Sequence, residues 1–201
     1  MTTAQDLAIV ALSAAARRPL EQGDLSLALA GAEMLDLIQA RALVVEGDRI
    51  LPSAQSPTGE RMLDEAASSL VRQEPYESVE DWLWRRGRGL FSAYVADLER
   101  VGLATRPRGR LIPLRTGRPV PVDSPARRGA EERRATGEPV LATLAAAAGI
   151  QDVSDDAAAD LDDEPVATVL AAVGDAVMEL EALRQRRAIE NAAFDNVWRG
   201  Q

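Results

Sequence analysis

Apolar residues recur at intervals of three and four along most of the chain, a pattern that predicts a mainly helical protein. The clearest example is near the C-terminus, where valine or leucine occupies positions 166, 169, 170, 173, 177, 180 and 183. This spacing places the side chains on one face of a helix that begins at Glu164-Pro165. Arg184, Arg186 and Arg187 follow toward the C-terminal end of the same helix.

The same periodicity, together with start and stop signals, predicts six further helices. Pro19 ends the first helix, and Asp24 is a plausible N-cap of the second. Gly87 and Gly89 interrupt the fourth at a cost of about 1 kcal/mol each relative to alanine. These helices are expected over residues 3–16, 24–41, 60–72, 78–101, 124–136 and 140–148.

Two short β-hairpins are expected between the helices. Residues 43–45 and 49–51 flank a Glu46-Gly47-Asp48 turn, and residues 103–105 and 110–112 flank a second glycine-containing turn. The three prolines in residues 113–123 predict an extended loop there. We therefore expect a mainly α fold: a compact single-domain helical bundle over residues 1–201 with two or more short β-hairpins, and an acidic loop at 151–164 before the last helix.

The composition argues against an enzyme. The chain has no cysteine and no histidine, so disulfides, thiol catalysis, Cys-based zinc sites and the commonest general base are excluded. The acids of residues 151–164 do not follow the spacing of a calcium loop. We expect no catalytic residues, no metal, no cofactor and no small-molecule substrate.

The sequence also predicts where the protein resides. The N-terminus lacks the basic region of a signal peptide, and no apolar run approaches the roughly 20 residues that span a bilayer. We expect a cytoplasmic protein.

Charge is distributed unevenly along the chain. The net charge is −9, yet residues 100–134 hold ten arginines against three acids, whereas residues 151–183 hold ten acids and no arginine. We call residues 100–134 the basic band. Such a band in an acidic chain indicates a local contact with an anionic partner. Nucleic acid is a weaker alternative, and we do not expect it as a partner.

The sharpest local cluster is Arg85, Arg86 and Arg88 beside Trp82 and Trp84. One interpretation is a site for lipid phosphate with aromatic side chains at the membrane interface, because guanidinium groups bind phosphate through paired hydrogen bonds. The alternative places tryptophan in the core and pairs Arg85 with Asp81, four residues earlier. The residues taken alone favour this alternative.

The second predicted hairpin is the other candidate for contact. It mixes basic and apolar side chains, among them Arg108, Arg110, Leu111 and Ile112. Its apolar tip could enter a membrane surface with the arginines at the head groups. It could equally pack against a partner subunit or remain solvated.

Three stretches, in order, resemble the Golgi phosphoprotein 3 family, the phosphatidylinositol 4-phosphate effectors of Golgi membranes, with this chain as an actinobacterial-type member. The first is Leu29–Val45, a glycine-containing helix that ends in an Arg-x-Leu strand. The second and most specific is Pro57-Thr58-Gly59 followed by Leu63-Asp64-Glu65-Ala66. The third runs from the Trp82 helix into Leu98–Leu103. The resemblance covers about residues 3–150.

The resemblance implies a helical fold that binds lipid phosphate through a tryptophan and an arginine near the second helix and two arginines at the start of a later helix. A hydrophobic hairpin would assist membrane insertion or self-association. The tryptophan position falls near Glu21 and the second-helix arginine at Ala30, so both are replaced here. The later arginine pair falls in the region of Arg85, Arg86 and Arg88.

We therefore expect a non-enzymatic protein that is peripheral to the inner face of the membrane. Anionic lipid would be held by Arg85, Arg86 and Arg88 with Trp82. The alternative is a protein–protein adaptor that has lost phosphatidylinositol 4-phosphate binding. A protein partner or a homo-oligomer is compatible with both functions.

Overall fold

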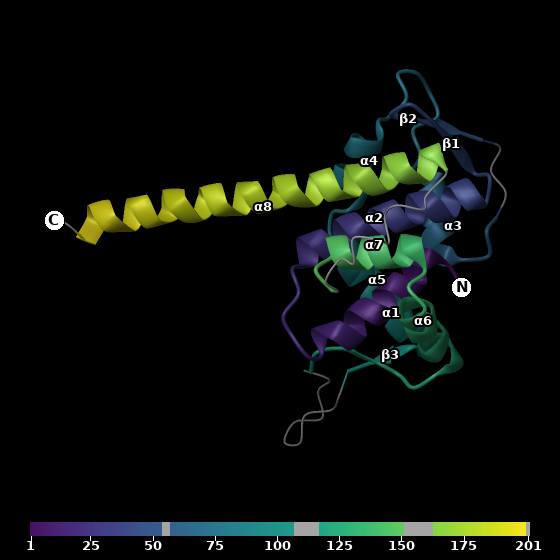
Figure 1. Cartoon of the computed structure of the whole chain (residues 1–201), viewed down its shortest axis with the longest axis horizontal. Coiled ribbons are helices and arrows are strands. Elements are labelled where there is room, and N and C mark those ends of the chain that lie inside the picture. Colours follow the sequence, from purple (N-terminus) through teal and green to yellow (C-terminus); the bar gives the residue numbers. More distant parts are fainter. Residues whose placement is uncertain (54–56, 107–116, 151–162, 200–201) are drawn as a thin grey trace.

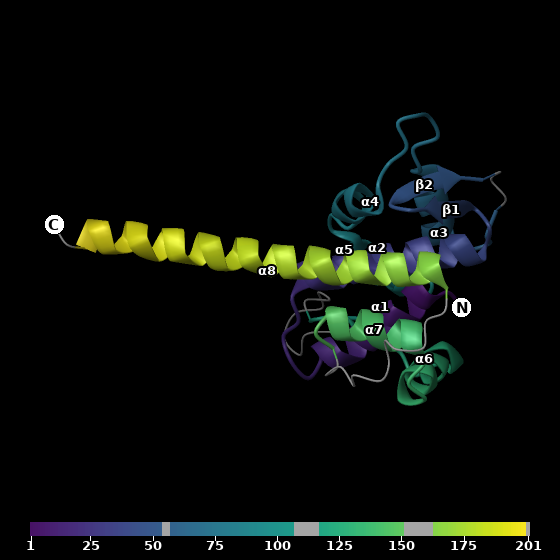
Figure 2. The same cartoon turned by 45° about the horizontal axis from the view of Figure 1, so that its top comes forward.

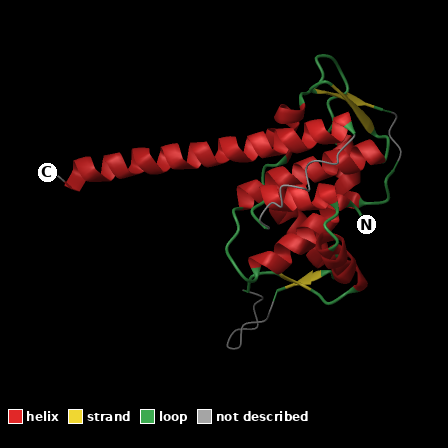
Figure 3. Ribbon diagram, in the orientation of Figure 1, coloured by secondary structure: helices red, strands yellow, loops and turns green. Residues whose placement is uncertain are grey.

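A computed structural model describes residues 1–53, 57–106, 117–150 and 163–199, with side chains up to residue 192 in the last helix. The mainly α fold with two short antiparallel strand pairs is confirmed (Figure 3). The helices are α1 (Thr3–Ala15), α2 (Gln22–Gln39), α3 (Arg61–Ser68), α4 (Val79–Arg86), α5 (Leu90–Arg100), α6 (Pro125–Ala135), α7 (Pro139–Ala147) and α8 (Glu164–Arg199). The strands are β1 (Leu43–Glu46), β2 (Arg49–Pro52), β3 (Ala104–Thr105) and β4 (Val120–Pro121).

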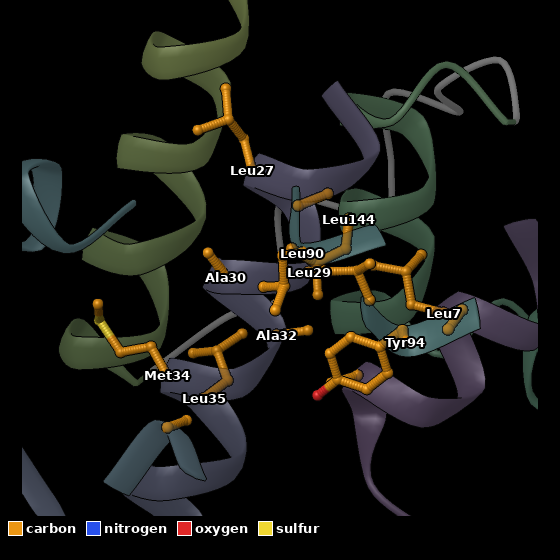
Figure 4. Close-up of a cluster of buried hydrophobic side chains, with 14 of the residues drawn as sticks. Leu7, Leu27, Leu29, Ala30, Ala32, Met34, Leu35, Leu90, Tyr94 and Leu144 are labelled. Atoms are coloured by element: carbon orange, nitrogen blue, oxygen red, sulfur yellow. The ribbon is translucent and has the colours of Figure 1, made fainter. Parts of the chain in front are cut away.

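Helix α2 forms the centre of the molecule, and every residue from Leu25 to Leu37 is buried. A helix that is apolar on nearly all sides is stable only where neighbours surround it. Helices α1, α5, α7 and α8 supply those neighbours (Figure 1). Figure 4 shows side chains of α2 among Leu7 of α1, Tyr94 of α5 and Leu144 of α7.

Two features fix α2 against its neighbours. Gly31 lets α8 approach closely, because a Cβ at this position would collide with Cγ2 of Val173. The buried carboxylate of Asp36 accepts hydrogen bonds from the backbone N–H groups of Thr3 and Ala4 at 2.8 and 2.9 Å. Asp36 thereby caps the N-terminus of α1 from another helix, where negative charge suits the helix dipole.

The boundaries differ from the sequence prediction in three places. The N-cap of α2 is Glu21, and Asp24 instead lies in the first helical turn. The helix predicted over residues 78–101 divides into α4 and α5, because Gly89 adopts φ +69°, a left-handed conformation that favours glycine. Strand β3 pairs with β4, inside the stretch predicted to be loop, while the predicted partner strand at 110–112 lies outside the described residues.

Helix α8 has two halves with different surroundings. Its first half packs on α2, α4 and α7, and Val169, Val173 and Ala176 are buried there. Beyond Arg184 the helix continues away from the bundle, as Figures 1 and 2 both show. Every residue from 185 to 192 is exposed. In the described parts of the chain, no helix is both long and apolar enough to cross a membrane.

Candidate functional site: the arginines of α4 and the N-terminal end of α2

Helix α4 carries Arg85 and Arg86 of the predicted cluster, and Arg88 follows in the turn before α5. The start of α4 is well defined. Ser78 is the N-cap, and its hydroxyl accepts a hydrogen bond from the backbone N–H of Asp81 at 3.0 Å. Asp81 lies in the first turn, where its charge suits the helix dipole. This start directs Trp82 and Arg86 inward and leaves Arg85 at the surface.

Trp82 does not lie at the surface. Its side chain is fully buried, and its indole N–H donates to the carbonyl oxygen of Ala30 at 3.2 Å. The predicted interfacial role requires an exposed ring, so the structure supports the alternative of tryptophan in the core. Burial is favourable because the tryptophan adds a large apolar surface to the core, and its N–H group keeps a hydrogen bond there.

Arg85 is exposed but already has partners. Its guanidinium makes two hydrogen bonds to the Glu77 carboxylate, at 2.6 and 2.7 Å, and lies 5.2 Å from the centroid of the Trp82 ring. The pairing with Asp81 considered from the sequence is replaced by this longer-range pair. A fork-like pair of this kind holds the side chain in one orientation.

Arg86 is almost entirely enclosed. Its side chain is 11% exposed and forms two hydrogen bonds with the fully buried Glu33 carboxylate, at 2.7 and 3.0 Å. A third bond at 2.9 Å reaches Glu65 of α3, and the Tyr94 hydroxyl of α5 donates to Glu33 at 3.0 Å. We call these four residues the Glu33 cluster. It joins α2, α3, α4 and α5, so Arg86 supports the fold instead of facing a ligand.

The electrostatics of the cluster keep Arg86 charged. Burial lowers the pKa of Arg86, but hydrogen bonds and charge from Glu33 and Glu65 outweigh burial and raise it. Burial and the adjacent Glu33 carboxylate both raise the pKa of Tyr94 well above its usual value. Tyr94 therefore remains a neutral hydrogen-bond donor.

Arg88 is exposed like Arg85, but unlike Arg85 and Arg86 it has no ion pair with any described residue. It borders a shallow hollow of about 270 Å³ together with Trp84 and Leu180. Gln22 and Gly23, at the start of α2, also line this hollow. The hollow combines an apolar floor with one arginine, which suits an anion attached to an apolar group.

A second hollow has a volume of about 310 Å³, and Gln22 borders both hollows. Phe91 and Leu25 contribute to its apolar lining. Arg106 and Arg118 also border it; Arg106 pairs with Glu99 at 2.7 Å, whereas Arg118 is exposed and has no partner among the described residues. We call the region bordered by Arg88, Arg106 and Arg118 around Gln22 the α2 N-terminal face.

Five of the seven described arginines of the basic band pair with acids. Arg127 pairs with Glu131, Arg128 with Asp123, and Arg133 with both Asp6 and Glu138. These pairs offset much of the positive charge in the described part of the band, so they do not favour a nucleic-acid surface there. The predicted hairpin residues Arg108, Arg110, Leu111 and Ile112 lie outside the described residues.

The residues that carry the family resemblance have structural roles. The Asp64 carboxylate accepts hydrogen bonds from both the backbone N–H and the hydroxyl of Thr58, each at 2.7 Å. These bonds lower the pKa of Asp64. They fix the Pro57-Thr58-Gly59 turn against the first turn of α3.

Asp97 provides a pH-dependent link between α3 and α5. Burial raises the pKa of Asp97, but hydrogen bonds from Arg61 at 2.7 Å and Arg100 at 2.9 Å outweigh burial and lower it. A lowered folded-state pKa stabilises the fold above the unfolded pKa of about 3.9, and this contribution is lost as pH falls through the folded-state pKa.

We expect Asp97→Asn to lower the free energy of unfolding by about 1–2 kcal/mol at pH 7, because two charge-assisted bonds weaken. The difference from the parent protein should shrink as pH falls below about 4. Urea titrations of both proteins at pH 7 and below pH 4 measure this difference in the free energy of unfolding. The control is Asp123→Asn, since Asp123 is 78% exposed and its loss should cost less than about 0.5 kcal/mol. An Asp97→Asn difference that does not change with pH would contradict the assignment.

Sequence reasoning missed Glu33 and Tyr94 as partners of Arg86, and it missed that Gln22 borders both the hollow beside Arg88 and the hollow beside Arg118. Glu33 had a signal: it is an acid within the apolar run of α2. No local signal could relate Arg118 to Gln22, because the two lie on separate elements.

Comparison with known proteins agrees with the sequence resemblance. A family model described as Golgi phosphoprotein 3 (GPP34) matches residues 4–188. No curated protein matches the chain significantly.

Proposed function

Because the chain belongs to the Golgi phosphoprotein 3 family, we propose that it is a non-enzymatic peripheral membrane protein that binds anionic lipid head groups at the α2 N-terminal face. The family suggests a lipid-binding or adaptor role, and the proposal assigns that role to particular residues. Arg88, predicted from the sequence, remains the central residue. Arg85 and Arg86 are excluded from the proposed contact because Glu77 and Glu33 already engage them.

One observation carries the proposal: Arg88 and Arg118 have no described partner, and each borders an apolar hollow that includes Gln22. Arginines left without acids beside apolar surface suit a membrane, whose phosphates and acyl region lie next to each other. Such a surface gains about 1 kcal/mol per basic residue near an anionic membrane.

The adaptor alternative rests on a different observation. Ala30 and Glu21 occupy the positions where the family resemblance implies an arginine and a tryptophan. Ala30 is fully buried, and Glu21 brings negative charge to the start of α2. Both changes argue against specific recognition of phosphatidylinositol 4-phosphate. The proposal therefore concerns anionic head groups as a class, with the protein at the inner face of the membrane.

Co-sedimentation with vesicles tests the proposal. The full chain should bind vesicles that contain phosphatidylglycerol, bind less as salt is added, and bind vesicles of phosphatidylcholine alone weakly. Adding phosphatidylinositol 4-phosphate to the anionic vesicles tests for a preference beyond charge. If the protein fails to bind anionic vesicles even at low salt, the lipid proposal is refuted and the adaptor function is favoured.

A further inference from the structure

Helix α8 presents an exposed face that nothing in the described structure covers. Residues at alternating intervals of three and four are all exposed along it: Asp175, Met178, Ala182, Gln185, Ile189 and Ala192. We call this set the outer stripe. Met178 and Ile189 are 65% and 70% exposed, so both large apolar side chains of the stripe face solvent. In a two-stranded coiled coil the residues that face the partner helix recur at this spacing, and Met178 and Ile189 are the large apolar members of the outer stripe.

The C-terminal half of α8 also lacks support from its own bundle. Isolated helices shorter than about 12–15 residues are marginal in water, and in proteins packing of an apolar face supplies most helical stability. Residues 185–199 form a helical arm of about that length, and its described side chains are exposed. A partner helix along the outer stripe would provide the missing contact.

Charge along α8 indicates which partner fits. Glu164, Asp175, Glu179 and Glu181 make its first half acidic, with no arginine before Arg184. Arg186 and Arg187 then give the start of the arm a positive charge, whereas Arg184 pairs with Asp24 of α2. A second copy of α8 in antiparallel orientation places each arm against the acidic first half of the other.

We propose that two copies of this chain associate through the outer stripes of their α8 helices, packed antiparallel around a two-fold axis near residues 183–184. In this register Met178 of one copy meets Ile189 of the other, and Ala182 meets Gln185. Each contact occurs twice because the interface is symmetric. The small Ala182 side chain allows close approach at the centre.

Two charged residues beside the stripe complete the pairing. Glu179 and Arg186 lie on the same flank, one heptad apart, and neither makes an ion pair with a described residue. Flanks of the same kind face each other in an antiparallel pair, so Glu179 of one copy lies against Arg186 of the other. Such flanking pairs set partner choice and orientation.

The proposed surface differs from the α2 N-terminal face, so it is tested without lipid. Analytical ultracentrifugation of the full chain should show a reversible dimer. Glu179→Arg alone and Arg186→Glu alone should each weaken the dimer by about tenfold, because both ion pairs become like-charge contacts. An equal mixture of the two variants should dimerise again, since every pair is then opposite in charge. Circular dichroism confirms that both variants remain folded.

Cysteine cross-linking tests the register directly, because the chain has no native cysteine. Met178→Cys and Ile189→Cys should form little disulfide dimer when oxidised separately and much more when mixed. Efficient cross-linking of Met178→Cys to itself would indicate a parallel pair and overturn the proposal. A parent protein that stays monomeric, or a mixture that does not regain the dimer, would also overturn it. If the chain is monomeric and Ile189→Glu abolishes vesicle binding, the membrane is the occupant instead.

Discussion

Replacing Arg86 with methionine is expected to lower the free energy of unfolding by about 3–5 kcal/mol, because it leaves the buried Glu33 carboxylate without its counter-charge. Methionine retains much of the apolar stem of arginine, so the change removes charge and hydrogen bonds with little loss of volume. Urea denaturation monitored by tryptophan fluorescence measures the effect, and the fully buried Trp82 is a suitable reporter.

Two control variants separate the buried charge from other causes. Arg128→Met removes an arginine that is 63% exposed and pairs with Asp123, which is 78% exposed, and should cost no more than about 1 kcal/mol. Tyr94→Phe removes one hydrogen bond to Glu33 and should cost about 1 kcal/mol. The double variant Arg86→Met with Glu33→Gln should recover part of the loss, because the amide carries no charge. Equal costs for Arg86→Met and Arg128→Met would contradict the view that the unpaired charge of buried Glu33 causes the loss.

The second large effect is expected in vesicle binding. Arg88→Glu combined with Arg118→Glu should reduce binding to anionic vesicles by about 100-fold or more. Each reversal replaces an attraction of about 1 kcal/mol with a repulsion of similar size. Both side chains are exposed and have no described partner, so folding should be unaffected. Co-sedimentation at low salt provides the measurement.

Charge reversals of arginines outside the α2 N-terminal face show whether the position of an arginine matters for vesicle binding. Arg128→Glu changes an exposed arginine of α6, outside the two hollows of the α2 N-terminal face, and should change binding by less than about threefold. Arg85→Glu tests an arginine that was assigned to the lipid site from the sequence and that pairs with Glu77 in the structure. If either control reduces binding as much as the double reversal, the protein attracts membranes through overall charge and the α2 N-terminal face is not a defined site.

The sequence predicted the scaffold well because helix spacing, caps and turns are local. The first hairpin, the Ser124-Pro125 start of α6 and the amphipathic face of α8 all follow from neighbouring residues. The predicted helix boundaries were wrong where contacts with residues distant in the sequence determine them. The sequence predicts Asp24 as the N-cap of α2, yet Asp24 lies in the first turn of that helix and pairs with Arg184 of α8 at 2.8 Å.

The candidate site was only partly predictable, for a related reason. The sequence identified Arg85, Arg86 and Arg88 as a cluster, but their availability depends on partners far along the chain. Glu33 lies more than fifty residues before Arg86 and engages it, and Glu77 engages Arg85. Arg118 comes from a separate segment. Periodicity shows which face of a helix a residue occupies, but it does not show which acid from another element will meet it.

The central position of α2 has a consequence for how the protein is made. Helix α2 is the second element in the sequence, yet α8, the last, covers the side of α2 at Gly31. Ribosomes add about 5–20 residues per second, so the roughly 145 residues between α2 and Arg184 require about 7–30 s. During that interval the nascent chain exposes the apolar surface of α2 that α8 later covers. Newly made chains therefore have an extended period in which a chaperone can bind them or two incomplete chains can aggregate.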